Sequence, residues 1–354
     1  MKIFKSLTCL CAVLGLLVVL TGCPNSAHKA DEKVEPKGKV NFTFFDTVSY
    51  VYSYAADSQE QFDANCDGVF EILGEYHRLF DIYYEHSGVN NLKTLNLNAG
   101  GEPIAVDPKL IDFLLYAKEL YATTGGEMNV MMGSVLSLWH DCREAADVSP
   151  ADASIPAPEA LSEAALHTDI SLLEIDPEKG TVRISDPKAR IDVGALGKGY
   201  ATERAAQYLR DNGAESYVLN IGGNIRIIGH KPDGTGWGTG IKDPAAPSQY
   251  ALKLTIADTS CVTSGDYERY FFVNGTKYHH VIDKDTLMPS TYFSSVTVLT
   301  PNSGLADALS TALFSMSYEE GLALVTEIGN VDVLWIKSDG TQHMTPGLAA
   351  LILE

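Results

Sequence analysis

The sequence predicts an α+β fold in which helices and β-sheets follow one another irregularly along the chain. Residues 57–84 and 107–123 repeat apolar side chains at helical spacing. After residue 216, short runs rich in β-branched and aromatic residues indicate strands. The order lacks the regular strand–helix–strand alternation of a doubly wound fold. We therefore expect one α+β domain in which helices pack on mixed β-sheets.

Composition limits the classes of function. The chain has 354 residues, 45% of them hydrophobic, which is enough to bury a substantial core. Its formal net charge is -20. Nucleic-acid binding needs clustered Lys and Arg to neutralise phosphates, so the sequence argues against such a partner. An anionic small ligand would need local donors, a few cations or a divalent metal.

The N-terminus has the features of a targeting segment. Two lysines precede an apolar run at residues 7–20, which is shorter than a typical membrane-spanning helix. Leu20-Thr21-Gly22-Cys23 then resembles a bacterial lipobox, so we expect residues 1–22 to be removed and Cys23 to be diacylated. Two acyl chains would anchor the protein stably to the extracytoplasmic face of the bacterial cell membrane. An ordinary signal peptide ending near a cysteine is the alternative.

A tether and a single domain follow the leader. Residues 23–39 are rich in charged residues and proline and lack aromatic residues, as a disordered tether would. The domain is assigned to residues 40–354. Its cysteines, Cys66, Cys142 and Cys261, are widely spaced and form no CxxC motif. They imply neither a disulfide framework nor a zinc site, and the sequence leaves open whether two of them pair.

Apolar periodicity and turn residues assign the elements of the first half of the domain. In chain order they are a strand pair or one long strand at 40–54, a helix at 57–84, a polar turn-forming segment up to residue 103, a helix at 107–123, a helical stretch at 130–139, an exposed connection at 145–161, and two short strands within 167–186.

The second half is predicted to be mostly β. Its elements are a helix within 190–208, a strand at 216–220 continued at 225–229, a glycine-rich loop around Trp237, strands at 251–256 and 267–273 with a polar turn at 264–266 between them, an Asn-Gly hairpin turn at 274–275, a strand at 293–299, helices at 306–317 and 318–328, and a closing strand at 331–336.

Residues 190–208, RIDVGALGKGYATERAAQY, form the stretch around which candidate chemistry gathers. A glycine-rich turn with Asp192 and Lys198 leads into a helix-forming run. Such a turn can bring backbone N–H groups, a cation and a helix N-terminus to one point, as a phosphate-bearing ligand requires. It matches neither the Walker pattern nor GxGxxG, and a purely structural turn is the alternative.

Two further motifs carry candidate chemistry. Asp307 and Thr311 lie four residues apart on one helical face and could give Mg²⁺ two oxygen ligands, although both could serve the helix alone. His279 and His280 are adjacent on a strand, so only one of them can face a given site. A histidine is the usual general base for a hydroxyl, and a structural histidine is the alternative.

Taken together and in order, these motifs resemble the ApbE family of FAD:protein FMN transferases. The matching strings are DVGALGKGYATERA, LNIGGNIRIIG, GIKDP, TSGDYERYFFVNGTKYHHVID and LADALSTALF, and more weakly FFDT, FDIYYEHSGVNNL and TGGEMN. The resemblance covers about residues 40–336. It implies a T-fold-related architecture and a Mg²⁺-dependent enzyme outside the cytoplasm.

The implied reaction cleaves the FAD pyrophosphate. FMN moves to a Thr or Ser hydroxyl of a target protein through a phosphoester bond, and AMP is released. The acceptors would be proteins of membrane or extracytoplasmic electron transport that carry a short Ser/Thr flavinylation motif. This chain lacks such a motif, so we do not expect it to modify itself.

The resemblance also implies roles for single residues. Asp192 and Lys198 would contact FAD, and His280 would be the base. The Ala195 carbonyl, Asp307 and Thr311 would hold the metal. Further positions align with the flavin or adenosine pocket, namely Phe45, Phe80, Glu127, Met128, Asn129 and Val281.

This chain departs from the family pattern in two places. Many members have Met-Gly-Thr where this chain has Phe45-Asp46-Thr47, and Asp in place of Asn129. These changes affect the expected nucleotide contacts more than the reaction. Two other functions stay open: a Mg²⁺-dependent FAD pyrophosphatase, in which water replaces the protein hydroxyl, and a flavin-binding lipoprotein without chemistry. The Asp307/Thr311 pair and His280 favour an enzyme, because binding alone needs none of them.

Overall fold

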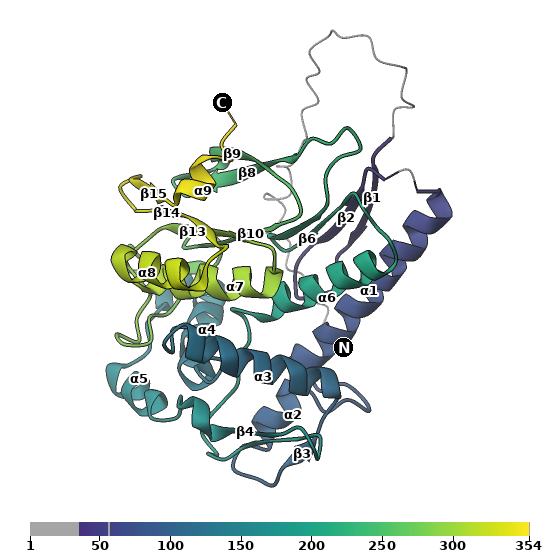
Figure 1. Cartoon of the computed structure of the whole chain (residues 1–354). Coiled ribbons are helices and arrows are strands. Elements are labelled where there is room, and N and C mark those ends of the chain that lie inside the picture. Colours follow the sequence, from purple (N-terminus) through teal and green to yellow (C-terminus); the bar gives the residue numbers. More distant parts are fainter. Residues whose placement is uncertain (1–34, 56, 354) are drawn as a thin grey trace, which may run out of the picture.

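The computed structural model describes residues 35–55 and 57–353, and its fold is α+β, as predicted. Residues 1–34, including Cys23 and most of the tether, lie outside the described residues. An eight-stranded sheet forms the centre (Figure 1). In spatial order its strands are β1 (Lys37–Asn41), β2 (Ser49–Ser53), β6 (Tyr217–Ile221), β7 (Asn224–Ile228), β10 (Ser260–Gly265), β13 (Ser295–Thr300), β14 (Asp332–Ile336) and β15 (Gln342–Met344). Neighbouring strands pair antiparallel.

Both faces of the central sheet are covered. Helices α6 (Gly197–Asp211), α7 (Ser303–Ala312) and α8 (Tyr318–Ile328) lie on one face. The hairpin of β8 (Trp237–Asp243) and β9 (Ala246–Ile256), together with the short α9 (Pro346–Ala349), lies on the other (Figure 1). Every residue of β13, SVTVLT, is consequently buried. Its sequence alternates Val and Leu with small hydroxyl residues, Ser and Thr, whose short side chains can be buried on the covered sheet.

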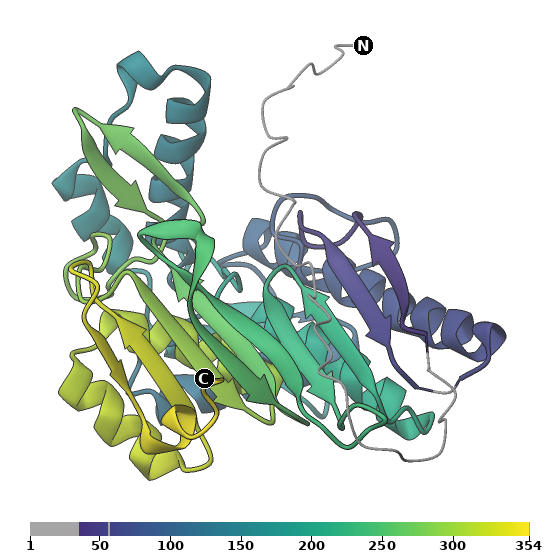
Figure 2. The same ribbon diagram turned by 90° about the horizontal axis from the view of Figure 1, so that it is seen from above.

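A helical layer lies beyond α6 and α7 (Figure 1). It contains α1 (Gln59–Phe80), α2 (Leu92–Leu97), α3 (Pro108–Thr123), α4 (Gly133–Val148), α5 (Pro158–Ala165) and a small sheet of β3 (Ile104–Ala105), β5 (Thr181–Ile184) and β4 (Leu173–Asp176). Short 3-10 turns occupy Pro150–Asp152, Ile170–Leu172 and Leu313–Ser315. A separate hairpin of β11 (Tyr270–Val273) and β12 (Thr276–His279) lies beside α4 (Figure 2).

The largest core joins α1, α3 and α6 and holds the start of α6 in place. Helix α1 begins after Ser58, whose side chain accepts a hydrogen bond from the N–H of Gln61. At its far end Phe80 packs on Phe113 of α3, with 4.1 Å between ring centroids. Phe113 also meets Tyr200 of α6 edge-on at 5.1 Å. The glycine-rich turn before α6 is therefore anchored by aromatic packing one helical turn away.

Several sequence predictions in the first half need correction. Of the two readings of residues 40–54, the strand pair is confirmed as β1 and β2, although β1 already begins at Lys37. The polar segment before residue 103 contains α2, whose N-terminus is capped by Asn91. The connection predicted at 145–161 instead holds the end of α4 and the start of α5. Helices α2 and α5 have only six and eight residues, too few for hydrophobic periodicity alone to detect them.

In the second half, the errors concern glycine and turn residues. The predicted loop around Trp237 is strand β8, whose Gly238 and Gly240 lie within the strand paired with β9. The turn predicted at 264–266 includes the end of β10, which pairs with β13. Strand β7 does not continue β6 but folds back on it at Gly222 and Gly223, whose φ values are 57° and 92°.

Two remaining features of the described residues are the state of the cysteines and the character of the helices. Cys66, Cys142 and Cys261 are all free, and Cys66 and Cys261 are buried. Among the described residues, none of the helices combines the length and the apolar character that crossing a membrane requires.

Replacing Phe113 with alanine should remove the ring that joins α1 to α6. We expect Phe113→Ala to lower the free energy of unfolding by about 3–5 kcal/mol, because the ring is fully buried and leaves a cavity. Urea denaturation measures this difference. Leu115→Ala, on the same helix but 41% exposed, is the matched control and should cost less than about 1 kcal/mol. Equal losses for the two variants would contradict the assigned core.

Candidate active site

The turn before α6 is fixed by hydrogen bonds to a distant segment. The N–H of Asp192 donates to the carbonyl of Val130 at 2.8 Å, and the N–H of Gly133 donates to the carbonyl of Arg190 at 3.2 Å. Within the turn, Asp192 Oδ1 accepts the N–H of Gly194 at 2.8 Å. The segment before α4 and the glycine-rich turn thus form one wall.

Helices α6 and α7 approach each other as closely as their backbones allow at Gly199. Its N–H donates to Oδ2 of Asp307 at 2.8 Å. A Cβ atom at Gly199 would lie 2.4 Å from Cβ of Asp307 and 2.4 Å from the carbonyl oxygen of Ser303. Only glycine fits here, and this absence of a side chain brings the Asp307 carboxylate to the start of α6.

Three oxygen groups in this region have the character of ligands for a hard cation. Asp307 is 5% exposed, and burial raises the pKa of its carboxyl although Lys198 and the Gly199 N–H oppose the shift. Thr311 follows one turn later on α7, with its hydroxyl 3.2 Å from that of Ser264. No hydrogen bond from the described residues reaches the Ala195 carbonyl.

This donor set fits Mg²⁺ better than a softer metal. A buried carboxylate is stabilised by a nearby cation, and one carboxylate, one hydroxyl and one carbonyl are all hard oxygen donors. The described residues contain no group of three His, Cys, Asp or Glu side chains that could hold a metal ion. A metal here would therefore depend on few protein ligands and on oxygens of a bound ligand.

The two adjacent histidines point to different environments. His279 is buried, with Nε2 2.9 Å from the carbonyl of Ser290 and its ring edge-on to Phe314. His280 is exposed, and its Nδ1 lies 3.2 Å from the carbonyl of Arg269. This contact favours a proton on Nδ1 and leaves Nε2 free to accept one. His280 is thus the histidine available for catalysis.

The pKa values of His280 and Asp192 are shifted by some of the same neighbouring charges. Although part of the His280 side chain is exposed, desolvation by neighbouring atoms and then the Arg269 and Lys198 cations lower its pKa below the ordinary histidine value. The ring is therefore neutral at physiological pH. Burial raises the pKa of Asp192, while His140, Arg269 and Lys198 act against this shift. Asp192, Lys198, His280 and Asp307 thus share neighbouring charges, although the protein as a whole is strongly acidic.

The sequence did not identify every residue around Asp192. Arg269 had a usable signal, because the Asn-Gly turn fixes the register of β11 and β12 and places Arg269 opposite His280. His140 on α4 and Tyr83 after α1 had none. Their rings lie 5.4 Å apart, and the charge of Asp192 acts on both. Only the tertiary fold brings these segments together.

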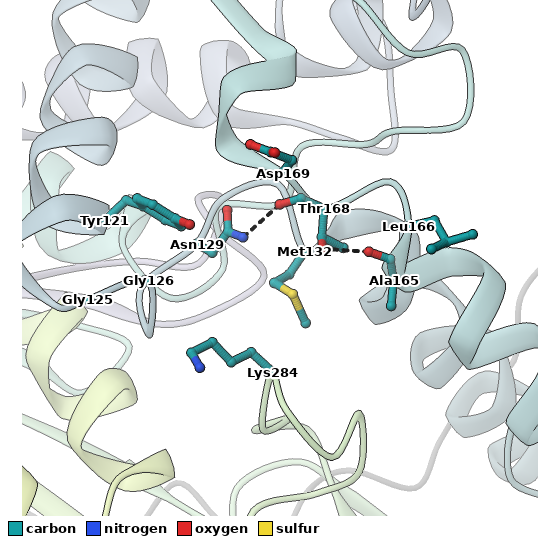
Figure 3. A pocket seen from close by; sticks show the side chains of 10 residues that line it. All are labelled: Tyr121, Gly125, Gly126, Asn129, Met132, Ala165, Leu166, Thr168, Asp169 and Lys284. Carbon is teal, nitrogen blue, oxygen red and sulfur yellow. Dashed lines mark hydrogen bonds between the residues drawn. The ribbon is translucent and has the colours of Figure 1, made fainter.

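A polar pocket of about 370 Å³ is lined in part by residues of the 125–132 segment (Figure 3). Asn129 and Lys284 face it from opposite sides, and Met132 points between them. The Asn129 amide donates to the carbonyl of Thr168 at 2.9 Å, which holds its orientation. Lys284 also pairs with Glu127 at 3.2 Å. This pocket therefore adjoins the Asp192 wall through residue 130.

The remaining predicted ligand residues have mixed placements. Phe45 has a left-handed backbone, φ 55°, and its ring meets His77 edge-on at 5.6 Å. Phe80, Met128 and Val281 are buried at 6%, 2% and 4% exposure and lie in core clusters. The backbone of Val281 is also engaged, with His279 Nδ1 and with Ser290. Their predicted contact with a flavin stays a prediction, and packing is what the structure assigns to them.

Comparison with known proteins agrees with this arrangement. The model of the ApbE family matches residues 30–335. The chain belongs to the ApbE family. A Treponema pallidum relative named FAD:protein FMN transferase is 31% identical to this ApbE-family chain over 317 residues, 85% of each chain. A Vibrio cholerae relative of the same name is 30% identical over 326 residues, covering 91% of this chain and 92% of the relative.

Solved structures of the family share the fold. An ApbE protein from Thermotoga maritima superposes with a TM-score of 0.78 at 25% identity, covering 90% of this chain and all of that one (100%). The flavin transferase ApbE from Vibrio cholerae gives a TM-score of 0.73 at 25% identity, covering 90% and 99% of the two chains. The ApbE resemblance predicted from sequence is therefore confirmed.

The contact at Gly199 can be tested in this ApbE-family chain without any ligand. Gly199→Ala should lower the free energy of unfolding by about 1–3 kcal/mol, because the new methyl group collides with the Ser303 backbone. Thermal or urea denaturation measures the change. Gly238→Ala adds the same methyl group where no atom lies within 4 Å and should be nearly neutral. A stable Gly199→Ala protein would contradict the close crossing of α6 and α7.

Proposed function

We propose that this protein is an FAD:protein FMN transferase. It moves FMN from FAD to a Thr or Ser hydroxyl of an acceptor protein, forms a phosphoester bond and releases AMP in a Mg²⁺-dependent reaction. The observation that carries this proposal is the convergence of Lys198, Asp307 and His280, a cation, a buried carboxylate and a neutral base, at the glycine-rich turn. The names of the relatives support the same substrate and reaction.

In the proposed reaction, each of these residues has a role that follows from its functional group. Asp307, Thr311 and the Ala195 carbonyl would hold Mg²⁺, which would supply positive charge to the pyrophosphate when bound. Lys198 adds a protein cation beside the same carboxylate. Nε2 of His280 accepts the proton of the incoming hydroxyl, whose oxygen forms the new bond to the FMN phosphorus. The bond from that phosphorus to the oxygen of AMP breaks, and AMP leaves with this oxygen.

Hydrolysis of FAD is the competing reaction at the same site. Water in place of the acceptor hydroxyl would give free FMN and AMP. We favour transfer because a docked Thr or Ser is held in line with the phosphorus, whereas water is not, and such positioning contributes effective concentrations far above those of free solution. A flavin-binding lipoprotein without chemistry would need neither a free Nε2 on His280 nor the Asp307/Thr311 pair.

The proposed location is the extracytoplasmic face of a bacterial membrane. The lipobox-like sequence at Cys23 supports lipid anchoring. The tether, which must end before β1 begins at Lys37 and not at residue 39, would give the domain reach toward membrane-bound acceptors. Acceptors in membrane or extracytoplasmic electron transport suit this placement.

Incubation of the purified protein with FAD, Mg²⁺ and a Thr-containing acceptor subunit should give a protein band with covalent flavin fluorescence and release AMP. Asp307→Ala should abolish this Mg²⁺-dependent turnover, because it removes the only carboxylate of the predicted metal site. Fluorescence in denaturing gels and chromatography of nucleotides measure the two products. Release of FMN and AMP without labelling would favour the hydrolase, and FAD binding without turnover would favour a binding protein.

The two histidines give a matched pair of variants. His280→Ala should reduce transfer by about 10²–10⁴-fold and leave FAD affinity unchanged, because the ring acts on the acceptor hydroxyl. His279→Ala should instead lower the melting temperature, since it removes a buried contact with Ser290. Transfer kinetics, FAD titration and thermal unfolding separate these effects. Loss of FAD binding and transfer together in His280→Ala would mark a structural histidine.

A further inference from the structure

Helices α6 and α7 are joined by two reciprocal hydrogen bonds, in each of which a backbone N–H of one helix donates to a carboxylate of the other. Asp307 on α7 accepts the N–H of Gly199 on α6 at 2.8 Å. Glu203 on α6 accepts the N–H of Ser303 on α7 at 2.8 Å. Glu203 lies one turn after Gly199, whereas Ser303 lies one turn before Asp307. The helices therefore run in opposite directions at this crossing, and each gives the other one carboxylate.

The two carboxylates differ in the cations that face them. Glu203 is 7% exposed, and its oxygens lie 3.3 Å from Nε of Arg226 and 3.3 Å from a terminal nitrogen of Arg210. Arg226 is itself only 1% exposed, and its Nε makes no hydrogen bond of good geometry within the described residues. Asp307 instead has Lys198 as the cation that acts on it. At the Glu203 end of the crossing, two arginines thus neutralise the carboxylate. At the Asp307 end, the carboxylate belongs to the candidate metal site.

Glu203 also completes the N-terminus of α7. The first N–H groups of a helix have no partner within the helix and favour a negative charge. Asn302 accepts the N–H of Leu305 at 2.9 Å, and Glu203 accepts that of Ser303. Helix α7 is therefore fixed along its axis at the turn that precedes Asp307.

We infer that Glu203, held by Arg226 and Arg210, is a positioning residue for the metal ligands of α7. The inference rests on the proposed function, in which Asp307 and Thr311 bind Mg²⁺. Mg²⁺ requires nearly ideal octahedral geometry with short bonds, so a small movement of α7 away from the Ala195 carbonyl weakens binding. Among the described residues, the Glu203 side chain bonds to the Ser303 N–H and the two arginines and not to Asp307, Thr311 or the Ala195 carbonyl, so it acts through the position of the helix.

The experiment measures metal affinity rather than turnover. Mg²⁺ is titrated calorimetrically into the full chain in the presence of ADP, which offers a pyrophosphate but no FMN. Glu203→Ala should weaken Mg²⁺ binding about tenfold or more, because loss of the groups that orient metal ligands typically lowers metal affinity by about 10–100-fold. Its affinity for ADP without Mg²⁺ should stay unchanged. A Glu203→Ala protein that binds Mg²⁺ like the wild type would overturn the inference.

Asp258→Asn is the matched control. Asp258 contacts both arginines, 2.9 Å from Arg210 and 3.6 Å from Arg226, but makes no contact with α7 among the described residues. Its replacement should leave Mg²⁺ affinity unchanged, and a loss equal to that of Glu203→Ala would show that the arginines matter only for general stability.

Two further variants keep the outcome decisive. If Glu203→Ala does not fold, Glu203→Gln keeps an acceptor for the Ser303 N–H and removes the attraction to the arginines. It should weaken Mg²⁺ binding in the same direction, and wild-type affinity in this variant would overturn the inference. Asp307→Ala tests the metal site itself. Wild-type Mg²⁺ affinity there would refute the proposed metal site, whereas loss there with normal affinity in both Glu203 variants would refute only the role of Glu203.

Discussion

The close crossing of α6 and α7 is the constraint on which the site depends. A glycine at position 199 lets the Asp307 carboxylate reach a backbone N–H at the start of α6. The same crossing places Lys198 where its charge acts on both Asp307 and His280. Groups more than a hundred residues apart in sequence become neighbours because one position lacks a side chain. The aromatic core around Tyr200 then holds this crossing against the helical layer.

Charge is distributed in opposite ways at the site and over the molecule. The chain carries a formal charge of -20, which on its own would repel a pyrophosphate. Near Asp192 and His280, however, the cations Lys198 and Arg269 come from two separate segments. Burial meanwhile raises the pKa of both Asp192 and Asp307, so each carboxylate gains from a nearby cation. The local cations and the proposed divalent metal would thus both offset the repulsion between the acidic protein and an anionic ligand.

Much of this could be predicted from sequence where the signal is local. Helices α1 and α3 follow from periodicity, and the Asn-Gly turn gives the register of β11 with β12. Strand β8 was missed because glycines are poor strand formers, and its conformation comes from pairing with β9. The motif order identified the family, but the Glu203–Ser303 bond has no sequence signature, since it depends on how two helices cross.

The sequence leaves two adjacent histidines as candidates, and the tertiary contacts decide which of them is accessible. Alternation on a strand requires that one ring faces inward, and the contacts of His279 with Ser290 and Phe314 determine which one. His280 is left at the surface, beside Arg269, where solvent reaches it. A base open to solvent activates water as readily as a hydroxyl unless something displaces the water. In the proposed reaction, selectivity for transfer over hydrolysis would then come from the acceptor, whose docked surface would both present the hydroxyl and exclude water from His280.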